Sequence, residues 1–591
     1  MKQRFYISAL FLTLLTALSS SAYDFASDGI YYEINGDNVK VVKNYNDLYS
    51  GNISIPETVR YNGKTYTVTS IGKSAFQSCS DLTSVAVGNS VISIEEYAFS
   101  YCENLTSVHL GHSVTTIGDF AFDQNYSLSS IDIPNSVTTI GQGFFYGCTA
   151  LKSIVIPSSV TQIGNRAFCY CPELESIVVA PGNTKYDSRN NCNAIIETAS
   201  DNLYAGCQST VIPNNVNTIG DFAFYYRPTL TTINIPNSVT SIGEYAFCGC
   251  ERLTSVDIPA SVLHIGTSAF SYCPELESII VASGNTVFDS RENCNALIET
   301  ASNVLLAGCR NSFIPETITT IGGSAFSGCT GLSHITIPRS VTTIDPGAFY
   351  GCTSLSSINI PSTVTSIGNN SFQATGLSIL TVESENPVYD SRNNCNALIE
   401  TASNTIITGC QGTIIPNSVT AIGEYAFYDC TGLTNVIFPK VLTDIGKGAF
   451  NGCSGLTEVV IPSSVTTLGM NAFYRCTSLT DVYSHIKDLS SVTVGNSVFS
   501  LRGNDYSGRK LHVPAGTIQD YENDYNWSPF FETIVEFEPG DVNGDSETNI
   551  ADINSVISVI LSGTTNALSD VNCDGETNIA DINAIISEIL K

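Results

Sequence analysis

Positive charge is scarce in this chain. Lys and Arg number 25 against 55 Asp and Glu, which gives the 591 residues a formal net charge of −30. All charged residues together make up 14% of the chain, whereas about 25% is usual in soluble proteins. Proteins that hold phosphate backbones or anionic lipids do so through clustered Lys and Arg. We therefore expect no nucleic-acid ligand.

Long apolar runs and catalytic motifs are also missing. After residue 22 no stretch approaches the roughly 18 uninterrupted apolar residues of a membrane-spanning helix, so we expect no membrane insertion. The sequence contains no G-x-S-x-G, no H-E-x-x-H and no C-x-x-C, which are motifs of serine hydrolases, zinc peptidases and thiol or zinc sites. Its six His have no repeated acidic partner. No residue is assigned a catalytic role, and we expect a protein that is not an enzyme.

The one long apolar run lies at the start of the chain. Lys2 and Arg4 precede an apolar stretch over residues 5–18, and small residues follow it up to Ala22. This order is typical of a secretory signal peptide, so residues 1–22 are predicted to be one. A buried N-terminal helix is the alternative. The signal-peptide interpretation makes the mature chain an exported protein.

A 23-residue period fills the middle of the chain. It is seen in the Phe residues from Phe76 to Phe168, and one unit reads LTSVDIPASVLHIGTSAFSYC at residues 253–273. Its Leu and β-branched residues are expected to face inward, and its Pro ends a short strand because Pro cannot donate to a sheet. A single unit buries too little apolar surface to fold alone, whereas a stack of units can fold. The repeat predicts a β-rich solenoid of short parallel strands.

The outward strand positions of this solenoid are mostly Ser, Thr and Asn. They include Thr83, Ser84, Ser129, Ser130, Thr231, Thr232, Ser356 and Ser357. Such a surface can hydrogen-bond a protein or a glycan, and it can equally be solvated strand.

The ends of the chain differ from the repeat, as the ends of a solenoid must. GIYYEI, VKVV and KTYTV suit an N-terminal β cap, and the only Trp, Trp527, lies near Phe530 and Phe531. We predict that this aromatic cluster covers the last coil and is not a ligand site. The predicted domains are a signal peptide (1–22), an N-terminal β cap (23–68), the solenoid (69–483), a C-terminal cap (484–537) and a small module (538–591).

Three longer gaps interrupt the period and hold a second repeat. The first contains YDSRNNCNAIIETASDNLYAGC, between Phe168 and Phe224, and two close copies follow it. Two apolar runs flank an A-S-x-N turn in each copy, which predicts a hairpin-like excursion. The excursions are either recognition knobs or wider coils of the same solenoid.

The 20 Cys fall into separate groups. Eleven lie three residues after a repeat Phe and are predicted to form an internal column of small apolar thiols. Three further pairs lie 15 residues apart across the excursions: Cys192 and Cys207, Cys294 and Cys309, and Cys395 and Cys410. In an exported protein these pairs are disulfide candidates, with free core thiols as the alternative.

Two acid-spaced segments end the chain. GDVNGDSETNIADIN at residues 540–554 returns as SDVNCDGETNIADIN at 569–583. Oxygen side chains occupy positions 1, 3, 5, 9 and 12 of each 12-residue loop, and position 7 would add a backbone carbonyl, which is the ligand pattern of a calcium loop. The candidate ligands of the two predicted Ca²⁺ sites are Asp541, Asn543, Asp545, Glu547, Asn549 and Asp552, and Asp570, Asn572, Asp574, Glu576, Asn578 and Asp581.

Each loop is predicted to continue into an amphipathic helix. The apolar residues of the first helix face are Ile550, Ile553, Val556, Ile557, Ile560 and Leu561, and those of the second are Ile579, Ile582, Ile585, Ile586, Ile589 and Leu590.

Both parts resemble known families. The repeat L-x-x-I-x-I-P-x-S-V-x-x-I-G-x-x-A-F-x-x-C resembles the BspA-like class of bacterial leucine-rich repeats, whose studied members are secreted or surface-exposed adhesins or interaction proteins. The paired loop-helix halves resemble a type I dockerin, a small α-helical module with EF-hand-like loops that binds a cohesin module. In that family positions 10 and 11 of each loop choose the partner, here Ile550 with Ala551 and Ile579 with Ala580.

These resemblances imply a function. We expect a secreted protein, at the bacterial cell surface or outside the cell, whose solenoid binds a protein or glycan. Its calcium-dependent dockerin would tether it to a cohesin-bearing partner. The alternative is a structural subunit that organises a polysaccharide-degrading complex.

Overall fold

The computed structural model describes residues 23–44, 48–537, 540, 542, 548–562, 569, 571 and 577–590. The predicted signal peptide lies outside the described residues. The chain divides into two compact units, Met1–Cys273 with Val281–Thr286 and Pro274–Ile280 with Val287–Lys591. Each is described by itself.

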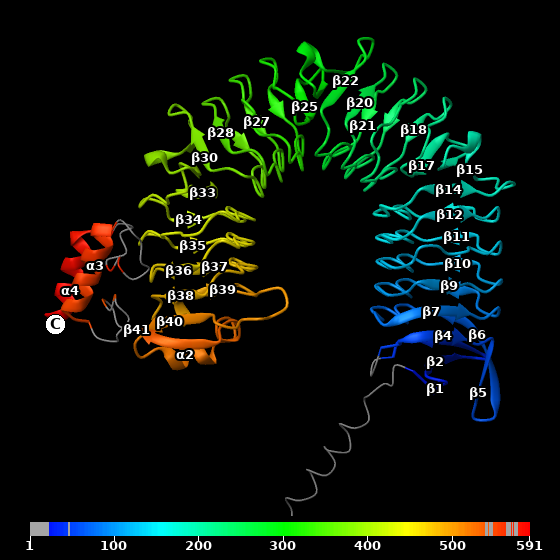
Figure 1. Ribbon diagram of the computed structural model, residues 1–591, viewed down its shortest axis with the longest axis horizontal. Coiled ribbons are helices and arrows are strands. Elements are labelled where there is room, and N and C mark those ends of the chain that lie inside the picture. The colour runs from blue at the N-terminus through cyan, green and yellow to red at the C-terminus, as the bar shows by residue number, and fades with distance from the viewer. Residues whose placement is uncertain are drawn as a thin grey trace, which may run out of the picture. The chain divides into compact units, whose positions relative to one another are not determined.

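Each 23-residue repeat forms one coil of a solenoid (Figure 1). Strand β12 (Ser153–Ile156) pairs in parallel with β14 (Ser176–Val179), and Ser153 lies opposite Ser176, one repeat further on. The two-residue strands β10 (Thr116–Ile117) and β11 (Thr139–Ile140) pair in the same register. Parallel pairing at a 23-residue offset confirms the predicted solenoid.

The first unit begins with antiparallel strands that lead into the coils. Its largest sheet runs in the order β1 (Phe25–Ser27), β2 (Ile30–Asn35), β3 (Asn38–Val42), β6 (Lys64–Ile71), β8 (Ser93–Ile94), β10, β11 and β13 (Gln162–Ile163), with β5 (Thr58–Tyr61) beside β6. A second face carries β4 (Gly51–Ile55), β7 (Leu82–Val87) and β9 (Ser107–His109). The last sheet holds β15 (Tyr186–Asp187), β16 (Ala194–Glu197), β17 (Asn202–Gly206), β18 (Thr218–Ile219), β19 (Ser241–Ile242) and β21 (His264–Ile265).

The second unit repeats this arrangement. One sheet holds β23 (Phe288–Asp289), β24 (Leu297–Glu299), β25 (Val304–Ala307), β26 (Thr320–Ile321), β27 (Thr343–Ile344) and β29 (Ser366–Ile367), and β28 (Ser357–Ile360) pairs with β30 (Ile379–Val382). The next holds β31 (Tyr389–Asp390), β32 (Leu398–Glu400), β33 (Thr405–Thr408), β34 (Ala421–Ile422), β35 (Asp444–Ile445), β37 (Thr467–Leu468) and β39 (Thr493–Val494). The last holds β36 (Glu458–Ile461), β38 (Asp481–Ser484), β40 (Lys510–Pro514) and β41 (Thr533–Phe537). The α-helices in the described part of this unit are α2 (Ile518–Asn523), α3 (Ile550–Ser562) and α4 (Ile579–Ile589).

The repeat Phe residues stack into columns at the centre of the coils. Phe76 and Phe99 have ring centroids 4.9 Å apart and nearly parallel planes. In the second unit the column continues to Phe499, whose ring lies 5.4 Å from that of Phe473. Phe499 lies 26 residues after Phe473, so the 23-residue period does not identify it as a member of the column. Trp527 is fully buried and packs on Phe499, as expected for an aromatic cluster over the last coil.

The cysteine column is more than apolar packing. The thiol of Cys102 lies 3.1 Å from the carbonyl oxygen of Phe76 in the preceding coil, and seven more repeat cysteines repeat this contact. Where Cys is replaced, Asn125 donates to the Phe99 carbonyl and Arg227 to that of Phe168. The position therefore favours a hydrogen-bond donor, which gives an inward carbonyl such as that of Phe76 a second partner beside the Cys79 amide of its own coil.

Arg509 supplies the donors at the end of this column. Its side chain is 3% exposed and donates to the carbonyls of Leu479, Phe499 and Cys476 at 2.8, 2.7 and 2.8 Å. Burial lowers the pKa of its guanidinium.

We predict that Arg509→Leu destabilises the protein strongly. The buried carbonyls of Leu479 and Phe499 would lose the Arg509 donor, whereas the carbonyl of Cys476 would keep the Leu479 amide at 3.3 Å. Each unpaired carbonyl costs about 1–3 kcal/mol, so we expect a loss of about 2 kcal/mol or more in the free energy of unfolding. Denaturant unfolding measures the change. Arg502→Leu is the control because Arg502 is exposed. Equal stability of the two variants would contradict this role for Arg509.

The three excursions form hairpins, as predicted. Strands β16 and β17 pair antiparallel, and β17 then pairs in parallel with β18 of the next coil. The other two copies pair in the same way, β24 with β25 and β32 with β33. Each hairpin is therefore part of the solenoid sheet, which favours the interpretation as wider coils.

Candidate functional site

The described residues of the two predicted calcium loops lie at the N-terminal ends of helices α3 and α4. Before α3, the Asn549 side-chain oxygen accepts a hydrogen bond from the Ala551 amide, and the Asp552 carboxylate accepts from the amides of Asn549 and Val542. These distances are 2.8, 2.8 and 2.7 Å. The side chains of Asn549 and Asp552 favour a helix start here, because they accept hydrogen bonds from backbone N–H groups that have no partner within the helix.

The second helix start repeats the first. The Asn578 side chain accepts from the Ala580 amide and the Asp581 carboxylate accepts from the Asn578 amide, both at 2.8 Å. Asp552 and Asp581 are both 0% exposed. Carboxylate and amide oxygens held together at a loop end form a donor set that suits a hard cation.

Of the twelve predicted calcium ligands, four belong to the described residues: Asn549, Asp552, Asn578 and Asp581. The structure brings them together in pairs, one pair at each helix start. The other eight, Asp541, Asn543, Asp545, Glu547, Asp570, Asn572, Asp574 and Glu576, lie outside the described residues.

A very small apolar core joins the two helices. Among the described residues it consists of Val542, Val556 and Ile585, with Ile553, Val571 and Ile582 packed partly against it. Burial of so few side chains contributes little stability, about 1.5–3 kcal/mol for each. We therefore expect the module to need a further source of stability.

Most of the other large apolar residues of both helices face solvent. Ile550 and Ile579 are each 72% exposed, and Leu561 and Leu590 are 82% and 79% exposed. Ile557, Ile560, Ile586 and Ile589 are also exposed. We call Ile550, Ile557, Ile560 and Leu561 the first apolar stripe. The second apolar stripe consists of Ile579, Ile586, Ile589 and Leu590. The predicted partner residues Ile550 and Ile579 lie on them, whereas Ala551 and Ala580 are half-buried.

The polar strand face of the solenoid is the second candidate surface. Its predicted outward residues, from Thr83 to Ser357, are exposed or half-buried. Many side-chain hydroxyl groups on the coils already donate a hydrogen bond to the neighbouring coil. For example, Thr106 donates to the carbonyl of Thr83, and Thr254 donates to that of Thr231. This ladder runs between successive coils and holds them in register.

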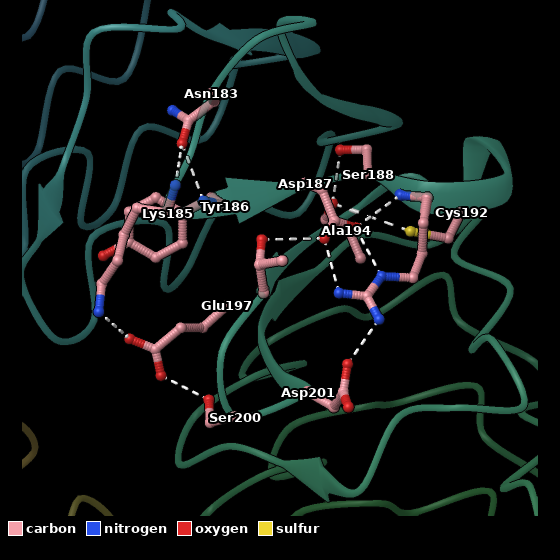
Figure 2. A network of polar contacts seen from close by, with 12 residues as sticks. Asn183, Lys185, Tyr186, Asp187, Ser188, Cys192, Ala194, Glu197, Ser200 and Asp201 are labelled. Atoms are coloured by element: carbon pink, nitrogen blue, oxygen red, sulfur yellow. Dashed lines mark hydrogen bonds and ion pairs between the residues drawn. The ribbon is translucent and has the colours of Figure 1, made fainter.

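The excursions carry a repeated polar network (Figure 2). In the first copy Arg189 binds both carboxylate oxygens of Asp187, at 2.7 and 2.6 Å, and reaches Asp201. Burial raises the pKa of Asp187, but the Arg189 hydrogen bonds outweigh it and the pKa is lowered overall. Arg291 with Asp289 and Arg392 with Asp390 repeat the pair. These side chains bind one another, which indicates a structural role.

The six hairpin cysteines are free thiols in the structure rather than three disulfides. The Cys207 thiol points to the carbonyl oxygens of Glu175 and Asn193, at 3.2 and 3.3 Å, whereas Cys192 lies against the carbonyl of Ala194. The two side chains thus have different surroundings. Cys294 with Cys309 and Cys395 with Cys410 follow the same arrangement.

We predict that these thiols are protected in the native protein. All six are buried, and burial raises the pKa of Cys294 to about 11, so little of its reactive thiolate forms at neutral pH. Alkylation should label them only after denaturation, without added reductant. Bridged peptides joining Cys192 to Cys207, or their equivalents, in non-reduced mass mapping would contradict the prediction.

Among the residues that the structure describes, no helix combines the length and the apolarity needed to cross a membrane.

Comparison with family models identifies both parts of the chain. The model of the BspA type leucine rich repeat region matches residues 69–196, 197–300, 306–401 and 407–504. The model of the dockerin type I domain matches residues 539–590. The comparison with curated proteins found no match.

Several solved structures are similar to this chain. A leucine-rich repeat protein from Bacteroides ovatus is 28% identical, over 75% of this chain and 95% of that one, with a TM-score of 0.37. One from Eubacterium ventriosum is 24% identical, over 59% and 93%, with a TM-score of 0.41. A leucine rich cell surface protein from Faecalibacterium prausnitzii is 25% identical, over 80% and 97%, with a TM-score of 0.30.

Members of the two matched families share several general properties. Both are non-catalytic and typically occur in extracellular or surface proteins. Type I dockerins bind calcium and pair with cohesins. Because the repeat model covers more than half of the residues, the chain belongs to the BspA-type leucine-rich repeat family and carries a type I dockerin domain at its C-terminal end.

Proposed function

We propose that this chain is a secreted, non-catalytic interaction protein with two separate working parts. The solenoid binds a protein or glycan, and the dockerin tethers the solenoid to a cohesin-bearing partner. The observation that carries the proposal is the duplicated helix start with its exposed apolar stripe, attached to a solenoid that has its own complete core. The proposed division is a signal peptide (1–22), caps at 23–68 and 484–537, the solenoid between them, and the dockerin from residue 538.

The dockerin part of the proposal includes two calcium sites. Each would use the six ligands predicted from its loop, of which Asp552 and Asp581 are fully buried at the helix starts. A cation placed among several carboxylates offsets their mutual repulsion and adds binding free energy to folding. The two apolar stripes then form two equivalent docking faces, because Ile550 corresponds to Ile579 and Leu561 to Leu590 in both position and exposure.

A second function is supported by the hydroxyl ladder. Because side chains such as Thr106 already donate to the neighbouring coil, part of the outward face serves the solenoid itself. This favours a structural subunit that spaces or organises the members of a polysaccharide-degrading complex.

One pull-down experiment tests the proposal and separates the alternatives. Residues 23–537 and 538–591 serve as separate baits in secreted extracts, with calcium present. We expect the second bait to capture a cohesin-bearing protein and the first to capture a different, saturable ligand. No saturable ligand on the first bait favours the spacer function. No cohesin-bearing protein on the second bait contradicts the tether.

A further inference from the structure

A hollow lies in the second unit, where the third excursion rejoins the coils. Its volume is about 350 Å³, and it is lined by Tyr350, Asn370, Gln373, Tyr425, Tyr428 and Asn451. A second hollow of about 320 Å³ shares Asn370, Gln373 and Tyr425 with it. Small-molecule sites in proteins begin at about 300 Å³, so the space is large enough for a ligand.

Two residues that line this hollow each carry a buried amide oxygen with no hydrogen-bond partner among the described residues. These oxygens are Oε1 of Gln373 and Oδ1 of Asn451, on side chains that are 5% and 9% exposed. The Gln373 amide nitrogen donates to the backbone carbonyl of Tyr425 at 3.2 Å, which fixes the orientation of the side chain. A buried acceptor without a donor is unfavourable. The hollow therefore suits a ligand that brings hydrogen-bond donors.

Aromatic rings form the rest of the wall. The ring centroids of Tyr350 and Tyr428 are 6.4 Å apart, and those of Tyr425 and Tyr428 are 5.8 Å apart at a steep angle. All three tyrosines are half-buried. None of the six residues that line the hollow is charged, whereas Glu424 lines the second hollow. Rings for apolar contact, together with amide acceptors and no charge, suit a neutral ligand with several hydroxyl groups.

In the first excursion the corresponding space is nearly filled by side chains. Counted from the Phe before and the Phe after each gap, Asn370 corresponds to Arg166 and Tyr425 to Phe222. The Arg166 guanidinium lies 4.1 Å from the centre of the Phe222 ring. The space left there, which corresponds to the second hollow of about 320 Å³, is about 10 Å³. The shorter Asn370 leaves the corresponding space in the third excursion open.

We infer that this hollow binds one uncharged sugar residue of a glycan. Hydroxyl groups of the sugar donate to the amide oxygens of Gln373 and Asn451, and its apolar face packs on the tyrosine rings. The inference rests on the proposed function and narrows its protein-or-glycan ligand to a neutral glycan at a named place.

Affinity electrophoresis of the full chain, in native gels with calcium, tests the inference. The probes are soluble neutral polysaccharides, namely galactomannan, xyloglucan, arabinoxylan and mixed-linkage β-glucan. We expect at least one of them to retard the chain. Asn370→Arg, which rebuilds the closed arrangement of the first excursion, and Gln373→Cys, which installs the Cys169 of that excursion, should each weaken retardation at least about tenfold.

Arg166→Asn is the matched control and should leave retardation unchanged. Thermal unfolding identifies any variant that fails to fold, and the other variant then decides. The inference is overturned if no polysaccharide retards the chain, if a folded variant binds as the wild type does, or if Arg166→Asn also loses binding. Cohesin capture by the same samples distinguishes the two proposals: capture without glycan retardation rejects the sugar site alone, whereas loss of capture counts against the tether.

Discussion

Replacing calcium with a chelator is expected to unfold α3 and α4 and to leave the solenoid folded. The described part of the module buries three core side chains fully or nearly so, and residues 541–591 contain nine acidic residues. Without a cation these carboxylates repel one another, and Asp552 and Asp581 would stay buried beside them. Helix content by circular dichroism measures the change in the full chain, because α3 and α4 hold 13 and 11 helical residues and α2 only 6.

The two loops should contribute unequally to this calcium dependence. Position 6, where a positive φ is preferred, is Ser546 in the first loop and Gly575 in the second. Asp570→Ala should therefore cost more helix than Asp541→Ala. Asp520→Ala in α2 is the control, because Asp520 is exposed in the first turn of a helix outside the dockerin. An unchanged spectrum on chelation would rule out calcium-dependent folding.

Cohesin capture is expected to survive the loss of one apolar stripe and to fail when both are lost. Because Ile550 and Ile579 are equally exposed, we expect that either half can face the partner. Ile550→Ser or Ile579→Ser alone should change the affinity for immobilised type I cohesin modules by about threefold or less. The double variant should weaken it by more than about thirtyfold, as expected for loss of a central apolar anchor.

The solenoid offers a matched control for the stripe variants. Ile414 is 74% exposed, so Ile414→Ser removes the same kind of apolar surface outside the dockerin and should not change capture. Full capture by the double variant would place the cohesin contact elsewhere on the module. Loss of capture in one single variant alone would show that only one half is used.

Much of the fold follows from the sequence because one coil repeats many times. The 23-residue period predicts the strand register directly, since Ser153 pairs with Ser176. The hairpins follow from two apolar runs around a polar turn. The helices of the dockerin follow from their loop spacing, but the division of their faces does not. Periodicity groups Val556 with Leu561, and the tertiary packing then buries the first and exposes the second.

The cysteines show where sequence reasoning leaves alternatives open. Recurrence alone suggests small apolar packing, but the replacements Asn125 and Arg227 are both donors, and that signal points to the carbonyls they satisfy. A spacing of 15 residues cannot give the direction of a side chain. A bulge between Ile195 and Ile196 shifts the pairing of the two hairpin strands, and the Cys207 thiol is directed to backbone carbonyls.

The hollow of the third excursion could not be read from one copy of the repeat. Only the contrast between Arg166 and Asn370 marks it, and the effect of that contrast depends on the ring packed against each residue. The two unpartnered amide oxygens are a property of burial, which a pattern of residue types does not supply.

Cohesin capture measured together with solenoid stability tests the central claim most directly, that recognition and tethering are separable parts of one chain. The samples are the full chain with calcium, the full chain with a chelator, and a chain that lacks residues 540–591. We predict that deletion and chelation each abolish capture, while the thermal unfolding of the solenoid and its ligand binding stay unchanged. If the truncated chain unfolds or loses its ligand, the C-terminal module belongs to the recognition surface and the two-part account is wrong.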